Sequence, residues 1–159
     1  MIKASSDPKQ QAILESAWTA FSTYGFRKTS MDDIARGAGM SRPAVYLRYR
    51  NKEAIFAGLV EWHYGLVLET VAAALASEGS LSERLHAAFA AQDGSAMKEM
   101  MDSPHGLELF EAGMSAAGEA IATGELALRG VYAQWLSAEA DAGHITLPGE
   151  VEEVARVFC

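Results

Sequence analysis

Apolar residues recur every three or four positions along almost the whole chain, which is the spacing of one helix face. The first clear instance runs through Ile13, Leu14, Ala17, Trp18 and Phe21. Strict alternation of apolar and polar residues, which strands require, is nearly absent, and Ala and Leu dominate the apolar positions. The pattern predicts an all-α protein, in which Trp18 packs into the core.

The ends of the first two helices carry their own signals. Asp7 followed by Pro8 is typical of a helix start, and Gly25 is a suitable residue for the end of that helix. Ser30 with Asp33 three residues later resembles a capping box, in which side chain and backbone satisfy each other at a helix N-terminus. We therefore expect a second, short helix from Ser30 to about residue 37.

A third short helix follows a glycine-bearing turn. Gly39 allows the positive φ that tight turns between helices require. Ser41 is a good N-cap, and Pro43 falls in the first turn, where its missing N–H costs little. Two short helices joined in this way predict a helix-turn-helix, whose second helix presents its N-terminal residues to the major groove of DNA.

The rest of the chain continues the helical pattern. We expect a long helix from Asn51 to about residue 76 and a final one that opens at Val151, with a loop at 143–149 before it. The helices expected between them span 81–91, 96–101, about 105–121 and 123–142. The interpretation is two domains, a helix-turn-helix domain over 1–52 and a helical ligand-binding and dimerisation domain over 53–159.

Net charge separates the same two parts. The 159 residues carry a net charge of −8, yet residues 1–52 hold nine Lys or Arg against four Asp or Glu, a balance of +5. The remaining residues sum to −13. A polyanion such as DNA is attracted to the first part and repelled by the second, which also orients the encounter.

Several classes of function lack support in the sequence. The single cysteine, Cys159, excludes a disulfide framework and a cysteine-built zinc site, and no metal site or cofactor is expected because the four histidines have no helical spacing. No apolar run is long enough to span a membrane, and no signal peptide is evident, so we expect a soluble cytoplasmic protein. No catalytic motif is present, which argues against an enzyme.

The third helix carries side chains that suit a DNA groove. Arg42 and Arg48 can pair with guanine, and small apolar groups such as those of Pro43 and Ala44 can touch a thymine methyl. The segment resembles the DNA-binding domain of the tetracycline-repressor (TetR) family over about residues 8–60. The resemblance is carried by Ala20-Phe21, Gly25-Phe26, Thr29-Ser30, Asp33-Ile34-Ala35, Ala38-Gly39-Met40-Ser41, Ala44-Val45-Tyr46-Leu47-Arg48-Tyr49 and Asn51-Lys52-Glu53-Ala54-Ile55.

The resemblance implies roles for individual residues. It places Thr29 or Ser30, Ser41, Tyr46 and Lys52 on phosphates, and Arg42, Pro43, Ala44 and Leu47 on bases. Arg48 and Arg50 depart from the residues common at those positions in the family, and both departures add positive charge that favours DNA. Tyr49 is expected in the core.

The same resemblance implies a ligand cavity among the middle helices. Candidate lining residues are apolar, sulfur-containing or aromatic: Trp62, Phe89, Met97, Met100, Met101, Leu109, Phe110 and Met114. The family pairs through its last two helices, the second of which breaks off here at Phe158-Cys159, so we expect a chain truncated at its C-terminus. Without truncation, the dimer surface would be short and built mostly from Leu128, Tyr132, Trp135, Val151, Val154 and Phe158.

These features favour a DNA-binding transcriptional regulator. In this hypothesis a homodimeric repressor binds double-stranded operator DNA and is released by a small apolar or cationic effector. Two alternatives stay open. One is a small-molecule carrier or enzyme that uses a helical cavity, and the other is an adaptor whose basic face binds an acidic protein.

Overall fold

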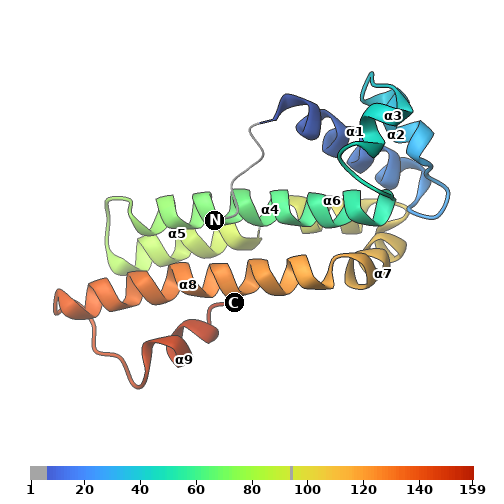
Figure 1. Cartoon of the computed structure of the whole chain (residues 1–159). Helices are drawn as coiled ribbons and strands as arrows, with labels where there is room; N and C mark the ends of the chain where they lie inside the picture. Colours follow the sequence, from blue (N-terminus) through green and yellow to red (C-terminus); the bar gives the residue numbers. More distant parts are fainter. Residues whose placement is uncertain (1–6, 94) are drawn as a thin grey trace. The chain divides into compact units, whose positions relative to one another are not determined.

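A computed structural model describes residues 7–93 and 95–159, with all of their side chains except those of 93 and 95–97. These residues form helices and connecting loops without a strand, which confirms the all-α prediction (Figure 1). The helices are α1 Pro8–Tyr24, α2 Met31–Gly37, α3 Arg42–Tyr46, α4 Lys52–Leu75, α5 Leu81–Asp93, α6 Ser95–Asp102, α7 Gly106–Ala116, α8 Gly118–Asp141 and α9 Val151–Arg156.

The first three helices begin where the sequence predicts. The Asp7 side chain accepts from the N–H of Lys9 at 2.9 Å and so caps α1. Ser30 and Asp33 form the predicted capping box at α2. The chain turns at Gly39, whose φ is +64°, and Ser41 then caps α3. The local signals therefore fix the helix-turn-helix before any tertiary contact is considered.

One predicted helix boundary is wrong. The sequence indicates one helix through Ile121, but the structure ends α7 at Ala116 and begins α8 at Gly118. Ala117 between them has φ −122° and ψ 15°, which is not helical, and it is almost fully buried. The bend brings Leu109 of α7 and Ala120 of α8 into the same core, and the apolar periodicity continues through it, so the pattern alone does not reveal it.

The described residues divide into two compact units. The first contains residues up to His63 together with Ser95–Ile121, and the second contains 64–93 and 122–159. Helices α4 and α8 each pass from one unit to the other. The boundary between these units therefore differs from the domain boundary predicted after residue 52. Residues 95–121 belong to the same compact unit as the helix-turn-helix.

The core of the first unit joins α1–α3 to the start of α4 and to α7. Three aromatic rings meet at its centre, with Phe21, Phe26 and Phe56 separated by 5.1–5.6 Å between ring centres. A Cβ at Gly113 of α7 would lie 3.0 Å from the Phe56 ring, so α7 approaches α4 closely. Leu109 is fully buried here, and Trp18 packs against the cluster as predicted.

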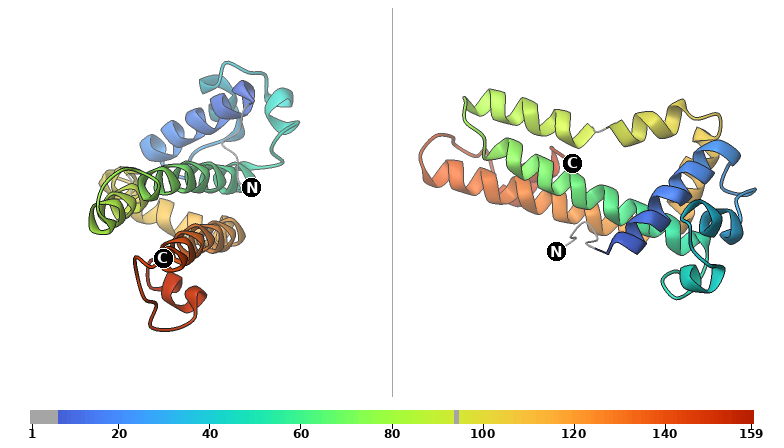
Figure 2. Two further views of the ribbon diagram at one scale, coloured as in Figure 1. Left: turned by 90° about the vertical axis from the view of Figure 1, so that its left-hand side faces the viewer. Right: turned by 90° about the horizontal axis from the view of Figure 1, so that it is seen from above.

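The second unit has a separate core of α4, α5, α8 and α9. Helix α9 folds back beside α8, as Figure 1 and the left view of Figure 2 show, and the contact is made by Tyr132 and Phe158, whose rings stack at 5.3 Å. Tyr132 and Leu128 are buried, and the other predicted dimer residues pack partly buried against the same cluster: Trp135, Val151, Val154 and Phe158. Tyr132 and Leu128 are buried within their own unit and are removed from the predicted dimer surface, whereas the role of the four half-buried residues stays a prediction.

Candidate nucleic-acid interface

Helices α2 and α3 are attached to α1 by buried contacts on one side. Val45 of α3 and Ile34 of α2 are fully buried in the first core. The Ser16 hydroxyl of α1 donates to the carbonyl oxygen of Ile34 at 2.8 Å. Tyr49 lies in the core as predicted, and its hydroxyl accepts from the side-chain amide of Gln10 at 2.9 Å. The opposite face of α3 is left facing outward.

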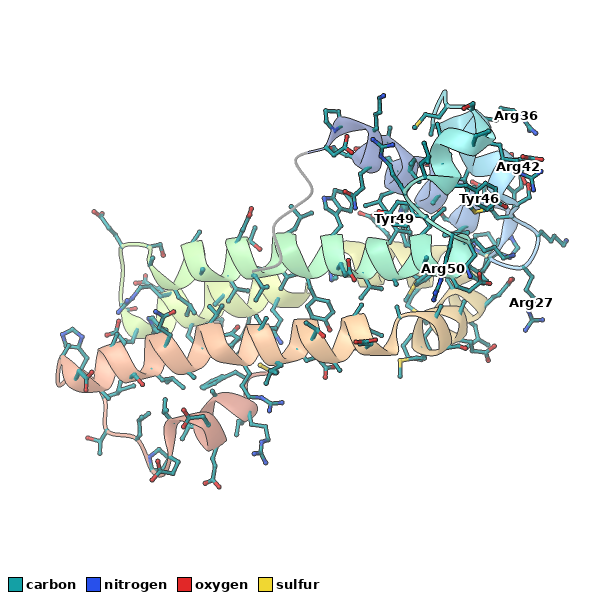
Figure 3. All side chains as sticks on the ribbon, in the orientation of Figure 1. Arg27, Arg36, Arg42, Tyr46, Tyr49 and Arg50 are labelled. Carbon is teal, nitrogen blue, oxygen red and sulfur yellow. The ribbon has the colours of Figure 1, made fainter. Side chains whose placement is uncertain are left out.

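That outward face presents a mixed apolar and cationic surface. Leu47 is 84% exposed, Pro43 is exposed beside it, and Ala44 is half-buried. Arg42 and Tyr46 are also exposed. In Figure 3, Arg36, Arg42 and Tyr46 lie together on the α2–α3 side, whereas Tyr49 points toward α1 and α4. The residues that the sequence predicts as base contacts are therefore brought together on one accessible surface.

Arg42 is held across the turn by its neighbours. Its guanidinium lies 5.5 Å from the centre of the Tyr46 ring and 3.4 Å from the Asp32 carboxylate. A hydrogen bond with Tyr46 and then the charge of Asp32 raise the pKa of Arg42, so the guanidinium keeps its charge. Because both members of the ion pair are exposed, the pair is weak, and Arg42 can exchange Asp32 for a guanine edge or a phosphate.

Two predicted phosphate contacts hydrogen-bond to backbone carbonyl oxygens of their own unit instead. Thr29 is 2% exposed, and its hydroxyl donates to the carbonyl oxygens of Gly25 at 2.8 Å and Ala20 at 3.2 Å. The Lys52 ammonium donates to three carbonyl oxygens of the loop before α2, those of Phe26, Arg27 and Thr29. Both side chains are thus occupied in shaping the loop, and we remove them from the set of DNA contacts.

The remaining predicted contacts have local partners as well. The Ser30 hydroxyl bonds to Asp33 and Ser41 accepts from the N–H of Ala44, so both serines cap helices. Hydrogen bonds from Ser30, side chain first and backbone second, lower the pKa of Asp33. The Arg48 guanidinium lies 3.0 Å from Asp7. The N–H of Lys9 and then Arg48 lower the pKa of Asp7, so the Asp7 carboxylate stays ionised at neutral pH.

Four further cations of the first unit are exposed, although the sequence analysis did not select them as contacts. Arg27 and Lys28 are exposed in the α1–α2 loop, Arg36 on α2 and Arg50 just before α4. In Figure 3, Arg36 lies near Arg42 on the α2–α3 side, whereas Arg27 and Arg50 lie toward the start of α4. The signal that could have found them is the excess of positive charge over 1–52, which no single motif carries.

The predicted ligand-pocket residues do not share one unit. Phe89 belongs to the second core, whereas Trp62, Met100 and Leu109 belong to the first. Met101, Phe110 and Met114 are exposed, and the Met97 side chain lies outside the described residues. An open groove of about 550 Å³ between α1 and α2 contains none of the predicted lining residues.

Two other kinds of site are absent from the described residues. Their His, Cys, Asp and Glu side chains form no group of three that could hold a metal ion. None of the described helices combines the length and apolar character that a membrane crossing demands.

Known proteins resemble the N-terminal segment in sequence. Residues 13–59 match the family described as Bacterial regulatory proteins, tetR family. The chain is 39% identical over 59 residues to the HTH-type transcriptional regulator EthR of Mycolicibacterium smegmatis, a match that covers 37% of this chain and 27% of that protein. A match of the same identity and length covers 29% of the uncharacterized HTH-type regulator YfiR of Bacillus subtilis. The chain thus matches less than a third of the length of these curated relatives.

Solved structures share the fold over most of the chain. A putative TetR-family transcriptional regulator from Syntrophomonas wolfei superposes with a TM-score of 0.69 at 18% identity, over 94% of this chain and 76% of that one. SmeT, the repressor of a Stenotrophomonas maltophilia multidrug efflux pump, gives a TM-score of 0.61 at 20% identity, over 92% and 71%. At these identities the likeness supports the all-helical fold beyond the N-terminal match.

Proposed function

Because residues 13–59 match the tetR family of bacterial regulatory proteins, we propose that this chain is a transcriptional regulator that binds double-stranded operator DNA. The observation that carries the proposal is the outward face of α3. Arg42, Ala44 and Leu47 face away from the core on a helix whose buried side is held by Val45. This arrangement fits a recognition helix, since its cation suits guanine and its apolar groups suit thymine methyls.

Contacts to the DNA phosphates would come from exposed cations on the segments before and after α3. Arg27, Lys28, Arg36 and Arg50 are exposed on the loops and helix that flank it. Arg48 is a further candidate, whose partner Asp7 is a single exposed carboxylate. Phosphate contacts of this kind set register and give most of the affinity, while base contacts select the sequence.

The direct test is selection of bound fragments from random DNA, followed by affinity measurement on the selected site. We expect wild type to prefer the selected site over unrelated DNA by about a thousandfold or more, as sequence-specific regulators do. Replacing Arg42 and Tyr46 together with Ala should remove most of that preference. Arg156→Ala, which removes an exposed cation in the second unit, is the matched control and should leave it intact. Failure to enrich any site would contradict the proposal.

We propose further that the regulator is a homodimeric repressor and responds to a small molecule. A two-fold dimer would place recognition helices in half-sites about 34 Å apart, one helical turn of DNA. Leu126 on α8 is 66% exposed and Gly130 one turn later faces open space, so this side of α8 is available to a second copy. Sedimentation of wild type and Leu126→Asp across a concentration series tests the dimer.

The effector proposal has separate support. A complex of SmeT with triclosan superposes on 94% of this chain with a TM-score of 0.62, so a closely similar fold accommodates a small apolar compound. We propose an apolar or cationic effector for this chain and a cytoplasmic location, where bacterial DNA lies. Release of the selected DNA by a panel of such compounds tests the effector. If no compound releases the DNA, the effector proposal fails, and the proposal of DNA binding is unaffected.

A further inference from the structure

The loop Gly25–Thr29 between α1 and α2 is held from two sides by helices outside the helix-turn-helix. From α4, the Lys52 ammonium binds the carbonyl oxygens of Phe26, Arg27 and Thr29 at 2.7–3.1 Å. From α7, the Glu108 carboxylate accepts from the backbone N–H of Arg27 at 2.7 Å. A cation thus binds acceptors of the loop, and an anion 81 residues after Arg27 binds the N–H of Arg27.

The connection between α6 and α7 and the first turn of α7 are fitted closely to the end of α1. The Ser103 hydroxyl donates to the carbonyl oxygen of Ser22 at 2.8 Å, which satisfies an acceptor in the last turn of α1. A Cβ at Gly25 would lie 2.6 Å from Glu108 Oε2 and 3.1 Å from His105 Nδ1. The absence of a side chain at Gly25 therefore leaves room for the Glu108 carboxylate beside the loop.

The held loop leads directly into the surface proposed to read DNA. Thr29 precedes Ser30, the N-cap of α2, and the turn and α3 follow within twelve residues. Arg27 contributes both a bound N–H and an exposed guanidinium. A change in the loop would therefore move a cation and the start of α2 together.

We infer that Glu108 is a positioning residue for DNA recognition, which acts by fixing the Gly25–Thr29 loop through the Arg27 N–H. The inference rests on the proposed function and extends it. The DNA-reading part of this chain then includes α7, and a displacement of α7 would weaken recognition by releasing the loop. The exposed face of α7, with Leu107, Phe110 and Met114, is not needed for this role.

The test compares three variants in the full chain. Glu108→Ala removes the acceptor, Glu108→Gln keeps one oxygen for the Arg27 N–H, and Glu111→Ala removes an exposed charge from the same helix. Affinity is measured for the selected site and for unrelated DNA, because loss of folded protein weakens both equally. Amide hydrogen exchange at Arg27 reports on the loop itself.

We expect Glu108→Ala to weaken binding of the selected site about fivefold, the value of one hydrogen bond. Its affinity for unrelated DNA should stay within about twofold of the affinity of Glu111→Ala for the same DNA. Exchange at Arg27 should accelerate in Glu108→Ala alone, and Glu108→Gln should behave like wild type. Equal weakening of both DNAs, or agreement of Glu108→Ala with Glu111→Ala, would overturn the inference. If wild type selects no site, the proposed function fails, and exchange at Arg27 still decides whether Glu108 holds the loop.

Discussion

The Lys52 ammonium lies 2.7 Å from the carbonyl oxygen of Phe26 and 4.7 Å from the centre of the same residue's ring. One side chain at the start of α4 thus binds both the backbone and the aromatic face of a residue that precedes α2. Its two other acceptors lie in the same loop, at Arg27 and Thr29. This relationship identifies Lys52 as a structural connection between α4 and the loop before the helix-turn-helix.

The first prediction concerns this connection. Lys52→Met keeps an unbranched side chain over the Phe26 ring but removes the three hydrogen bonds. We expect a loss of about 1–3 kcal/mol in the free energy of unfolding, because three carbonyl oxygens lose a charged donor. Urea unfolding at neutral pH measures this loss.

Lys98→Met is the matched control, since the Lys98 side chain is exposed and pairs only with Asp102 one turn along α6. Its effect should stay within about 0.5 kcal/mol. Equal stability of the two variants, together with a salt dependence of DNA binding that falls by one phosphate in Lys52→Met, would return Lys52 to the phosphate contacts.

Local chemistry explains how much of the fold could be predicted. The capping box of Ser30 and Asp33 and the positive φ of Gly39 depend on residues a few positions apart, so the sequence displays them directly. The bend at Ala117 has no such signal. It follows from the need of α7 and α8 to face one core, which only the tertiary structure reveals.

The candidate site divides in the same way. Arg42 and Leu47 are exposed as predicted because helix periodicity already separates them from Val45. The family resemblance places Lys52 on a DNA phosphate. In the structure its ammonium binds carbonyl oxygens 23–26 residues away, in a loop whose path the sequence does not show. A side chain that binds distant backbone atoms, as Lys52 does, therefore cannot be placed from the sequence alone.

The second prediction uses the fit of Gly25 against α7. Gly25 has φ +85° and ψ 158°, a region almost restricted to glycine, and an added Cβ would meet Glu108 Oε2 at 2.6 Å. Gly25→Ala should therefore lower the free energy of unfolding by about 2 kcal/mol or more. Gly39→Ala, with φ +64° and no atom within 4 Å of the added Cβ, should cost about 1 kcal/mol from backbone strain alone. Thermal or urea unfolding compares the two.

Adding Glu108→Ala to Gly25→Ala separates the backbone strain at residue 25 from the steric clash of the new Cβ with Glu108. The double variant should recover part of the loss caused by Gly25→Ala, since the carboxylate that meets the new Cβ is gone. Strict additivity of the two substitutions would show that Glu108 does not restrict the loop.

The third prediction concerns acid stability in the second unit. Glu139 is buried between two partners, Arg84 at 2.7 Å and His144 at 2.7 Å. The hydrogen bond from Arg84, then that from His144, lowers the pKa of Glu139 below its model-compound value of 4.5. A depressed folded pKa adds stability above the unfolded pKa, and that stability is lost as pH falls through the folded value. Wild type should lose stability more steeply below pH 4.5 than Glu139→Gln.

The measurement is the urea midpoint at a series of pH values from 7 to about 3. Glu152→Gln on α9 is the control, because its carboxyl group is exposed. Other carboxylates with lowered pKa, those of Asp7, Asp33 and Glu83, contribute equally to all three proteins and cancel in the comparison. Parallel pH profiles for wild type and Glu139→Gln would refute the assigned role of the pair.

The last prediction separates phosphate contacts from structural cations. Each phosphate neutralised on duplex DNA contributes about 0.9 to the slope of log affinity against log salt. Lys28 and Arg50 are exposed in the first unit, so Lys28→Ala and Arg50→Ala should each lower that slope by about one, with little effect on the preference for the selected site. Titrations at four or five salt concentrations measure the slope, with Arg156→Ala as the unchanged reference. A slope equal to wild type in both variants would place the DNA backbone on another surface of this unit.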